Sequence, residues 1–205
     1  SNNTCVTAPY ISFGTLTGTN VKATADGGDS CRGSTNEDVW YQFVAPCTGT
    51  LVLDTCGSPL DTVLSVHTGC PGTTANQVGC NDDNGGAGPC PGGLTSYLTV
   101  PVTAGVNYKI RVAGYNGSNG IFTLNVGFQG QSNDDCGNAF AMSPGSIYNG
   151  RTCGASNDGT ASCAPSQSSP DVWYTYTPAC THQMTLTTCG SNFDTVVSVF
   201  SGSCG

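Results

Sequence analysis

The sequence predicts an all-β fold, an antiparallel β-sandwich of two sheets held by disulfides. Ser, Thr, Asn and 29 Gly separate short apolar runs along the 205 residues, a usage that favours strands joined by tight turns over helices. No long stretch has the apolar period of a helix. Thirteen cysteines, none with paired metal-ligand spacing, favour disulfides formed in an oxidising, extracytoplasmic setting.

The first 130 residues are predicted to form a complete, jelly-roll-like sandwich of about eight antiparallel strands around one core. Alternation is clearest at 106–115, where Val106, Tyr108, Ile110 and Val112 face one way. The turn residues GYNGSNG then precede GIFTLNV, which predicts that 106–128 is a hairpin. The expected strands lie at 10–24 (two strands), 38–45, 49–55, 62–68, 76–80, 94–102, 106–115 and 120–128.

The chain repeats itself at roughly 130 residues, the size of a β-sandwich domain. CGSPLDTVLSV (56–66) returns as CGSNFDTVVSV (189–199), EDVWYQF (37–43) as PDVWYTY (170–176), and SNNTC (1–5) as SNDDC (132–136). This predicts a complete repeat at 1–130 and the N-terminal part of a second, truncated repeat at 131–205. The expectation is that the chain continues past Gly205 in a longer repetitive protein, with a homopolymer of rearranged strands as the alternative.

Charge and motifs exclude several function classes. With a net charge of -8 and five Lys+Arg, the chain cannot build the basic surface that nucleic acid requires. No apolar stretch approaches the ~18–20 residues of a membrane-spanning helix. The two Asp–Thr motifs suggest an aspartic protease, but Val63 and Val196 replace the glycine of its active loop. His67 has Phe200 as its counterpart, and no nucleophile elbow accompanies it. The sequence therefore predicts no catalytic residues.

The segment CNDDNGG (80–86) is the candidate metal site, with calcium as the cofactor. Asn81, Asp82 and Asp83 place hard oxygen ligands on a Gly-rich loop, and Asp61 approaches from the start of a neighbouring strand. The alternative is an acidic turn whose side chains accept hydrogen bonds from backbone amides.

Trp40 and Trp173 open the same strand in the two copies. Either they pack in the core, or they form an exposed platform for a ligand or partner.

Cysteine spacing limits the disulfide pairings. Cys47 and Cys56 flank a predicted strand and would lie roughly 30 Å apart, which excludes a bond between them. The candidate pairs are Cys5–Cys31, Cys70–Cys80 and Cys136–Cys163, with Cys90–Cys153 as a hypothetical bridge between the repeats.

Several of these motifs in order resemble the bacterial pre-peptidase C-terminal domain, particularly its cysteine-rich tandem version in secreted proteins. They are DVWYQF, CTGTLVLDTCGSPLDTVLSV, CNDD, PVTAGVNYKIRVAGYNG and IFTLNV. The resemblance implies a jelly-roll sandwich that serves as an accessory to secreted proteases or as a tandem module of surface proteins. Relatives in collagenases bind collagen, and some members bind calcium.

The predicted function is a non-enzymatic extracellular structural or adhesive repeat, a segment of a larger surface or filament-forming protein. Its expected partners are other copies of itself, or extracellular proteins and glycans, at the cell surface. The alternative is an accessory domain that binds protein or polysaccharide for a secreted hydrolase.

Overall fold

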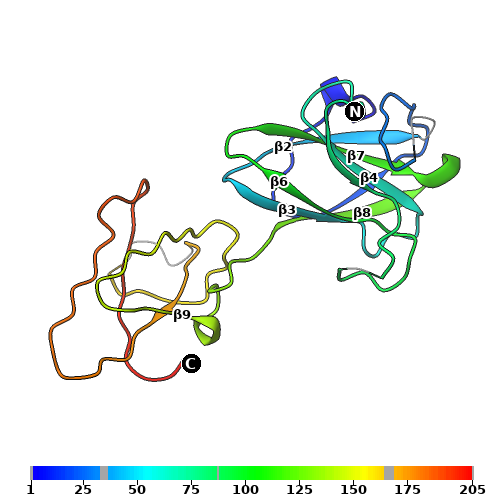
Figure 1. Ribbon diagram of the computed structural model, residues 1–205. Helices are drawn as coiled ribbons and strands as arrows, with labels where there is room; N and C mark the ends of the chain where they lie inside the picture. The colour runs from blue at the N-terminus through cyan, green and yellow to red at the C-terminus, as the bar shows by residue number, and fades with distance from the viewer. Residues whose placement is uncertain (1, 33–36, 87, 164–168, 205) are drawn as a thin grey trace. The chain divides into compact units, whose positions relative to one another are not determined.

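The chain forms two compact units, Ser1–Gln129 (unit 1) and Gly130–Gly205 (unit 2). The computed structural model describes residues 2–32, 37–86, 88–163 and 169–204. Unit 1 contains the long strands, which form two layers (Figure 1).

Unit 1 is an antiparallel β-sandwich of two four-stranded sheets, which confirms the predicted fold. One sheet has the order β1-β8-β3-β6 and the other β2-β7-β4-β5. The strands are β1 (Gly14–Thr19), β2 (Asp38–Val44), β3 (Gly49–Asp54), β4 (Thr62–His67), β5 (Gln77–Asn81), β6 (Tyr97–Val102), β7 (Asn107–Gly114) and β8 (Ile121–Phe128). Two short 3-10 helices, η1 (Cys5–Thr7) and η2 (Tyr115–Gly117), lie in its connections.

The core fills the space between these sheets. Phe43, Leu51, Leu64, Ile110 and Phe122 belong to one continuous apolar cluster and are at most 2% exposed. Burial of each such side chain contributes about 1.5–3 kcal/mol. Alternation along the strands supplies these residues from both inner faces, as a sandwich requires.

Two predicted local structures differ from the observed ones. The hairpin at 106–128 is wrong, because β7 pairs with β2 and β4 whereas β8 pairs with β1 and β3 in the other sheet. The turn around η2 therefore crosses from one sheet to the other. The stretch 10–24 holds one strand, β1, because residues before it make only a single bridge, Tyr10 to Gln42, and Lys22 adopts a turn conformation with φ 64°.

The outer face of the β2-β7-β4-β5 sheet is also covered, so every residue of β4 is buried. Beneath this cover Arg111 donates from Nε to Asp38 (2.6 Å) and from Nη1 to Asp29 (2.5 Å). All three side chains are fully buried. Burial of the carboxyl, and then its hydrogen bond with Asp26, raise the pKa of Asp38 to about 7. The nearby positive charge of Arg111 lowers this pKa and so opposes the shift.

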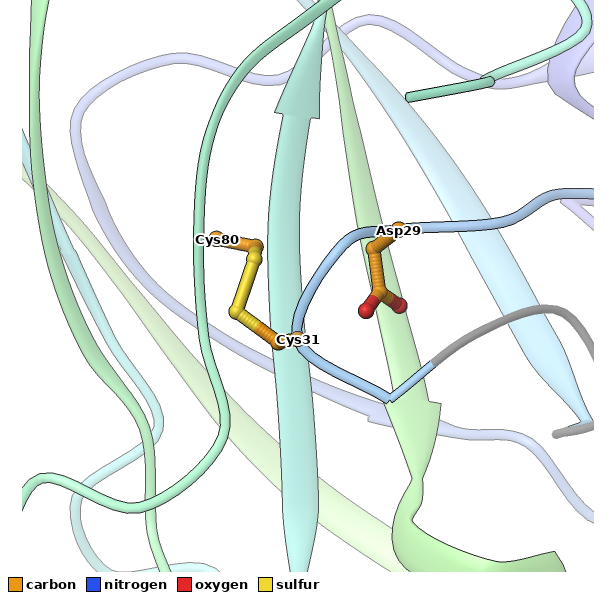
Figure 2. A group of neighbouring side chains, drawn as sticks. All are labelled: Asp29, Cys31 and Cys80. Carbon is orange, nitrogen blue, oxygen red and sulfur yellow. A yellow bond between two sulfur atoms is a disulfide. The ribbon is translucent and has the colours of Figure 1, made fainter.

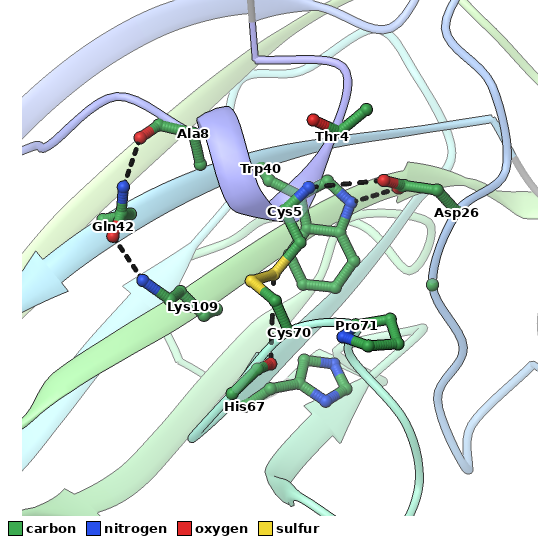
Figure 3. Close-up of a disulfide and its surroundings, with 12 residues drawn as sticks. Thr4, Cys5, Ala8, Asp26, Trp40, Gln42, His67, Cys70, Pro71 and Lys109 are labelled. Atoms are coloured by element: carbon green, nitrogen blue, oxygen red, sulfur yellow. Dashed lines mark hydrogen bonds between the residues drawn. A yellow bond between two sulfur atoms is a disulfide. The ribbon is translucent and has the colours of Figure 1, made fainter.

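Trp40 lies in this covered layer and is 0% exposed. Its indole Nε1 donates to Asp26 at 2.6 Å and to Asp38 at 3.0 Å. The Cys5–Cys70 disulfide lies beside the ring, as Figure 3 shows. Gly72 has no space for a side chain, since a Cβ there would meet the ring at 2.2 Å. Trp40 is therefore a packing residue, and the prediction of an exposed platform is wrong for it.

The disulfides join residues that the sequence did not pair. Cys70 lies beyond β4 at one end of the β4–β5 hairpin, whereas Cys80 lies opposite Ser65 within it, so the predicted Cys70–Cys80 bond is wrong. Cys56 bonds to Cys90 and not to Cys47, which confirms the exclusion of a Cys47–Cys56 bond and rules out Cys90–Cys153. The observed bonds include Cys5–Cys70, Cys31–Cys80, Cys56–Cys90 and Cys136–Cys204, in place of the predicted Cys5–Cys31 and Cys136–Cys163.

Unit 2 has little regular structure among its described residues: η3 (Cys136–Asn138), β9 (Phe140–Ala141) and β10 (Tyr174–Thr175). Its hydrogen bonds nevertheless occur at positions that match unit 1 in sequence. In unit 1 these bonds are Trp40 Nε1 to Asp26 (2.6 Å), Cys5 N to Asp26 (3.3 Å), Gly27 N to Asp38 (3.3 Å) and Ile11 N to Gln42 O (2.8 Å). Their counterparts in unit 2, in the same order, are Trp173 Nε1 to Asp158 (2.6 Å), Cys136 N to Asp158 (3.4 Å), Gly159 N to Asp171 (3.0 Å) and Met142 N to Thr175 O (2.8 Å).

Trp173 differs from Trp40 in its surroundings. It is half-buried, and its ring lies 5.7 Å from that of Phe200, where Trp40 has His67 at 5.5 Å. Its indole Nε1 is already occupied by Asp158. The predicted binding role of Trp173 stays a prediction.

Candidate metal centre

Three carboxylates converge where β4 begins and β5 ends. Asp61 directly precedes β4, and Asp82 and Asp83 directly follow β5. Antiparallel pairing of these strands, with Leu64 opposite Asn81, places the start of one beside the end of the other. Carboxylate oxygens of Asp61, Asp82 and Asp83 lie within 4.8 Å of one another. The structure thus brings together the three aspartates that the sequence singled out.

Two of these oxygens are buried and lack a hydrogen-bond partner within the described chain. They are Oδ1 of Asp61 and Oδ1 of Asp82. A buried acceptor without a donor costs about 1–3 kcal/mol. Asp82 uses its other oxygen, Oδ2, to accept a hydrogen bond from Arg32 Nε at 2.5 Å. The cluster therefore contains two buried carboxylate oxygens that no donor of the described residues satisfies.

The charges at the cluster do not balance. The three carboxylates have one guanidinium beside them, that of Arg32, which pairs with Asp82. The Cζ atom of Arg32 also lies 4.9 Å from the centre of the Tyr115 ring. The pKa of Asp61 is raised by burial and then by the negative charges of Asp82 and Asp83, with Arg32 opposing them. With all three aspartates ionised, the cluster has a net charge of -2, which a divalent cation would neutralise. Carboxylate oxygens are the ligands that calcium prefers.

Asn81 makes its hydrogen bonds within the loop. Its Oδ1 accepts from the backbone N–H of Tyr97 at 2.9 Å, and its Nδ2 donates to the carbonyl of Asp83 at 3.2 Å. These bonds hold the chain of Asp82 and Asp83 against β6. Asn81 thus positions the aspartates beside it, and its predicted role as a ligand stays a prediction.

The Cys31–Cys80 disulfide and Arg32 belong to this site, and sequence reasoning missed both. The disulfide ties the segment before Arg32 to β5, two residues before Asp82 (Figure 2). Asp29 lies near the same sulfurs but accepts hydrogen bonds from Arg111 Nη1 and from the backbone N–H of Arg32. Since both sulfurs are in a disulfide, the trio of Asp29, Cys31 and Cys80 is not a metal site.

The comparisons with known proteins decide the family. Residues 1–126, more than half of the chain, match the T9SS-associated family described as galactose binding domain-like. The chain belongs to this family. The family and the disulfide-rich fold fit a secreted protein. No curated protein matches the chain.

Two solved structures are similar to the chain at low identity. The pre-peptidase C-terminal domain of collagenase from Bacillus anthracis is 14% identical, with a TM-score of 0.38, over 58% of this chain and 93% of that one. PliG of Aeromonas hydrophila, a periplasmic inhibitor of g-type lysozyme, is 12% identical, with a TM-score of 0.33, over 58% and 96%. The family that the sequence resembles is thus among the solved structures found. Within the described part of the chain, no helix has the length and apolar character needed to cross a membrane.

Proposed function

We propose that this chain is a non-enzymatic structural or adhesive module of a larger, repetitive extracellular protein, stabilised by calcium at Asp61, Asp82 and Asp83. The observation that supports the repetitive architecture is the set of matched hydrogen bonds in units 1 and 2. Two further pairs extend it: Thr55 and Thr62 are in contact through their hydroxyls at 2.5 Å, and Thr188 and Thr195 at 2.7 Å. The same local hydrogen bonds therefore recur at matching sequence positions in the two units.

Assembly is the measurable property of such a module. We expect electron microscopy of the protein as its source produces it to show filaments or chains of regularly spaced domains. Strand addition at an open sheet edge is one physical route to these contacts. Isolated particles of a single sandwich, with no self-association in analytical ultracentrifugation, would contradict the structural role.

The second candidate is an accessory domain that binds carbohydrate or protein for a secreted hydrolase. The description of the family as galactose binding domain-like supports this alternative. Glycan-array and collagen-binding measurements separate the two. Tight, saturable binding by a monomer favours the accessory role, whereas assembly without such binding favours the structural one.

Calcium is expected to stabilise unit 1 through the three aspartates. At a free calcium concentration 100 times the dissociation constant, one site adds about 2.7 kcal/mol to the free energy of unfolding. Asp61→Asn and Asp83→Asn should each remove most of this gain, whereas Asp135→Asn, an exposed position in unit 2, should retain it. Thermal unfolding with calcium and with chelator measures the difference.

The same variants distinguish a calcium site from an acidic turn. Without calcium, Asp61→Asn should leave unit 1 as stable as the wild type or more stable, because it relieves repulsion among the three carboxylates. If these side chains instead only hold the turn, both variants lower the stability equally with and without calcium. That second result would remove calcium from the proposed function.

A further inference from the structure

Unit 2 exposes the stretch that corresponds to a fully buried strand of unit 1. The residues 195–200, TVVSVF, match β4, TVLSVH. Val63, Leu64 and Val66 of β4 are 0% exposed, whereas their counterparts Val196, Val197 and Val199 are 52%, 46% and 68% exposed. β-Branched residues such as Val and Thr are enriched in strands. The stretch 195–200 therefore has the sequence of a central strand without the neighbours of one.

In unit 1 those neighbours come from the segment that follows β4 in the chain. β4 lies between β5 and β7, and the opposing sheet contains β6 and β8. All four strands belong to residues 77–128. This segment thus supplies both neighbours of β4 in its own sheet and two of the four strands of the facing sheet.

The cysteines of unit 2 repeat the same relation. By sequence position, Cys163 and Cys189 correspond to Cys31 and Cys56 of unit 1. In unit 1 these two bond to Cys80 and Cys90, which are the cysteines of residues 77–128. In unit 2 both Cys163 and Cys189 are free, exposed thiols.

The position of Cys163 also suits such a bond. In unit 1, Cys80 lies directly opposite Ser65 across the β4–β5 pair. The counterpart of Ser65 is Ser198, and the sulfur of Cys163 lies 4.0 Å from its hydroxyl. A strand that paired with 195–200 as β5 pairs with β4 would bring its cysteine next to Cys163.

We propose that this face of unit 2 binds a segment of the same polypeptide with the strand pattern of residues 77–128, and that disulfides to Cys163 and Cys189 fix it. The two cysteines of the segment are ten residues apart, as Cys80 and Cys90 are. Each bond forms from two thiols by thiol–disulfide exchange with an oxidised disulfide of the extracytoplasmic compartment, which takes up the two electrons and two protons. A second copy is a poor donor, because its own residues 77–128 are paired inside its unit 1. This inference rests on the proposed repetitive function.

The test extends the chain and maps its disulfides. Residues 72–128 are appended after residue 205, and free thiols are alkylated before non-reducing peptide mapping. We expect Cys163 to be linked to the appended copy of Cys80, and Cys189 to the appended copy of Cys90. Cys180 should remain alkylated, because the segment 77–128 holds no partner for its counterpart Cys47. The control is the same extension with Cys80→Ser and Cys90→Ser in the appended copy, which should leave all three thiols alkylated.

Hydrogen exchange on the 205-residue chain keeps the proposal testable if the extension does not fold. Backbone amides of 195–200 should exchange rapidly, since strand partners are missing. Protection of these amides, a Cys163–Cys189 bond, or a disulfide-linked dimer through either thiol would overturn the proposal. So would an extension in which the appended cysteines pair with each other. Disulfide mapping and hydrogen exchange do not measure filament formation, so failure here and failure of the structural role are distinguishable.

Discussion

Replacing Arg111 with methionine is expected to destabilise unit 1 more than any other single substitution of its charged residues. The guanidinium is the shared partner of Asp29 and Asp38, and all three side chains are fully buried. Removal of one partner from a buried ion pair costs about 3–5 kcal/mol, because the remaining charge is left unpaired. That loss is a large part of the ~5–15 kcal/mol by which domains are typically stable. Chemical denaturation followed by Trp40 fluorescence measures it.

Lys109→Met provides the matched control on the same strand. Lys109 lies two residues from Arg111 in β7 and donates a hydrogen bond to Gln42, but it remains partly exposed. Lys109→Met should therefore cost less than about 1 kcal/mol. A loss from Arg111→Met as small as that from Lys109→Met would contradict the structural importance of the buried ion pairs.

The cost of Arg111→Met should also depend on pH. Without the guanidinium, Asp38 avoids a buried charge only by binding a proton, and its pKa is already raised to about 7. The variant is therefore expected to lose less stability at pH 5 than at pH 8. Adding Asp29→Asn and Asp38→Asn should recover part of the loss at pH 8, because neutral amides remove the unpaired charges.

The double variant Cys31→Ser, Cys80→Ser is expected to lose both stability and its response to calcium. The disulfide closes a loop with a sequence separation of 49 residues, and in the chain-entropy model its loss costs about 4 kcal/mol. It also holds Arg32 and Asp82 together, so without it the cluster loses its arrangement. The calcium-dependent shift in thermal unfolding should then be much smaller than in the wild type.

The variant Cys5→Ser, Cys70→Ser is the matched control. Its loop has a similar separation, 65 residues, so the entropic loss is again about 4 kcal/mol. This bond lies beside Trp40, away from the three aspartates. The calcium shift should therefore persist. Equal calcium shifts in the two double variants would show that the Cys31–Cys80 bond does not organise the site.

The acidic cluster could be predicted because its members are adjacent to strands whose pairing is local. β4 and β5 follow each other in the chain with a short connection, so Asp61 and Asp82 meet once a hairpin is assumed. Arg32 could not be added in this way. It reaches Asp82 from 50 positions away, through a loop that the Cys31–Cys80 bond and the hydrogen bonds of Asp29 and Ser30 place there.

The disulfide pairings show the same distinction. Spacing excluded Cys47–Cys56, because a strand keeps its two ends apart. Spacing could not choose the partners of Cys5 or Cys31. Cys70 and Cys80 are close in sequence, but Cys70 lies in the connection after β4 whereas Cys80 lies within β5. Nearness in sequence favoured Cys70–Cys80, and the register of β4 against β5 separates them.

The sequence by itself determined the sandwich class, the positions of most strands and which aspartates form the acidic cluster. These follow from alternation, turn residues and neighbouring strands, which are local properties of the chain. Only the tertiary structure decided that β7 and β8 lie in different sheets, that Arg111 and Trp40 are buried, and which cysteines are bonded. Each of these depends on segments far apart in sequence packing together, because a strand pattern states which face is apolar but not what covers it.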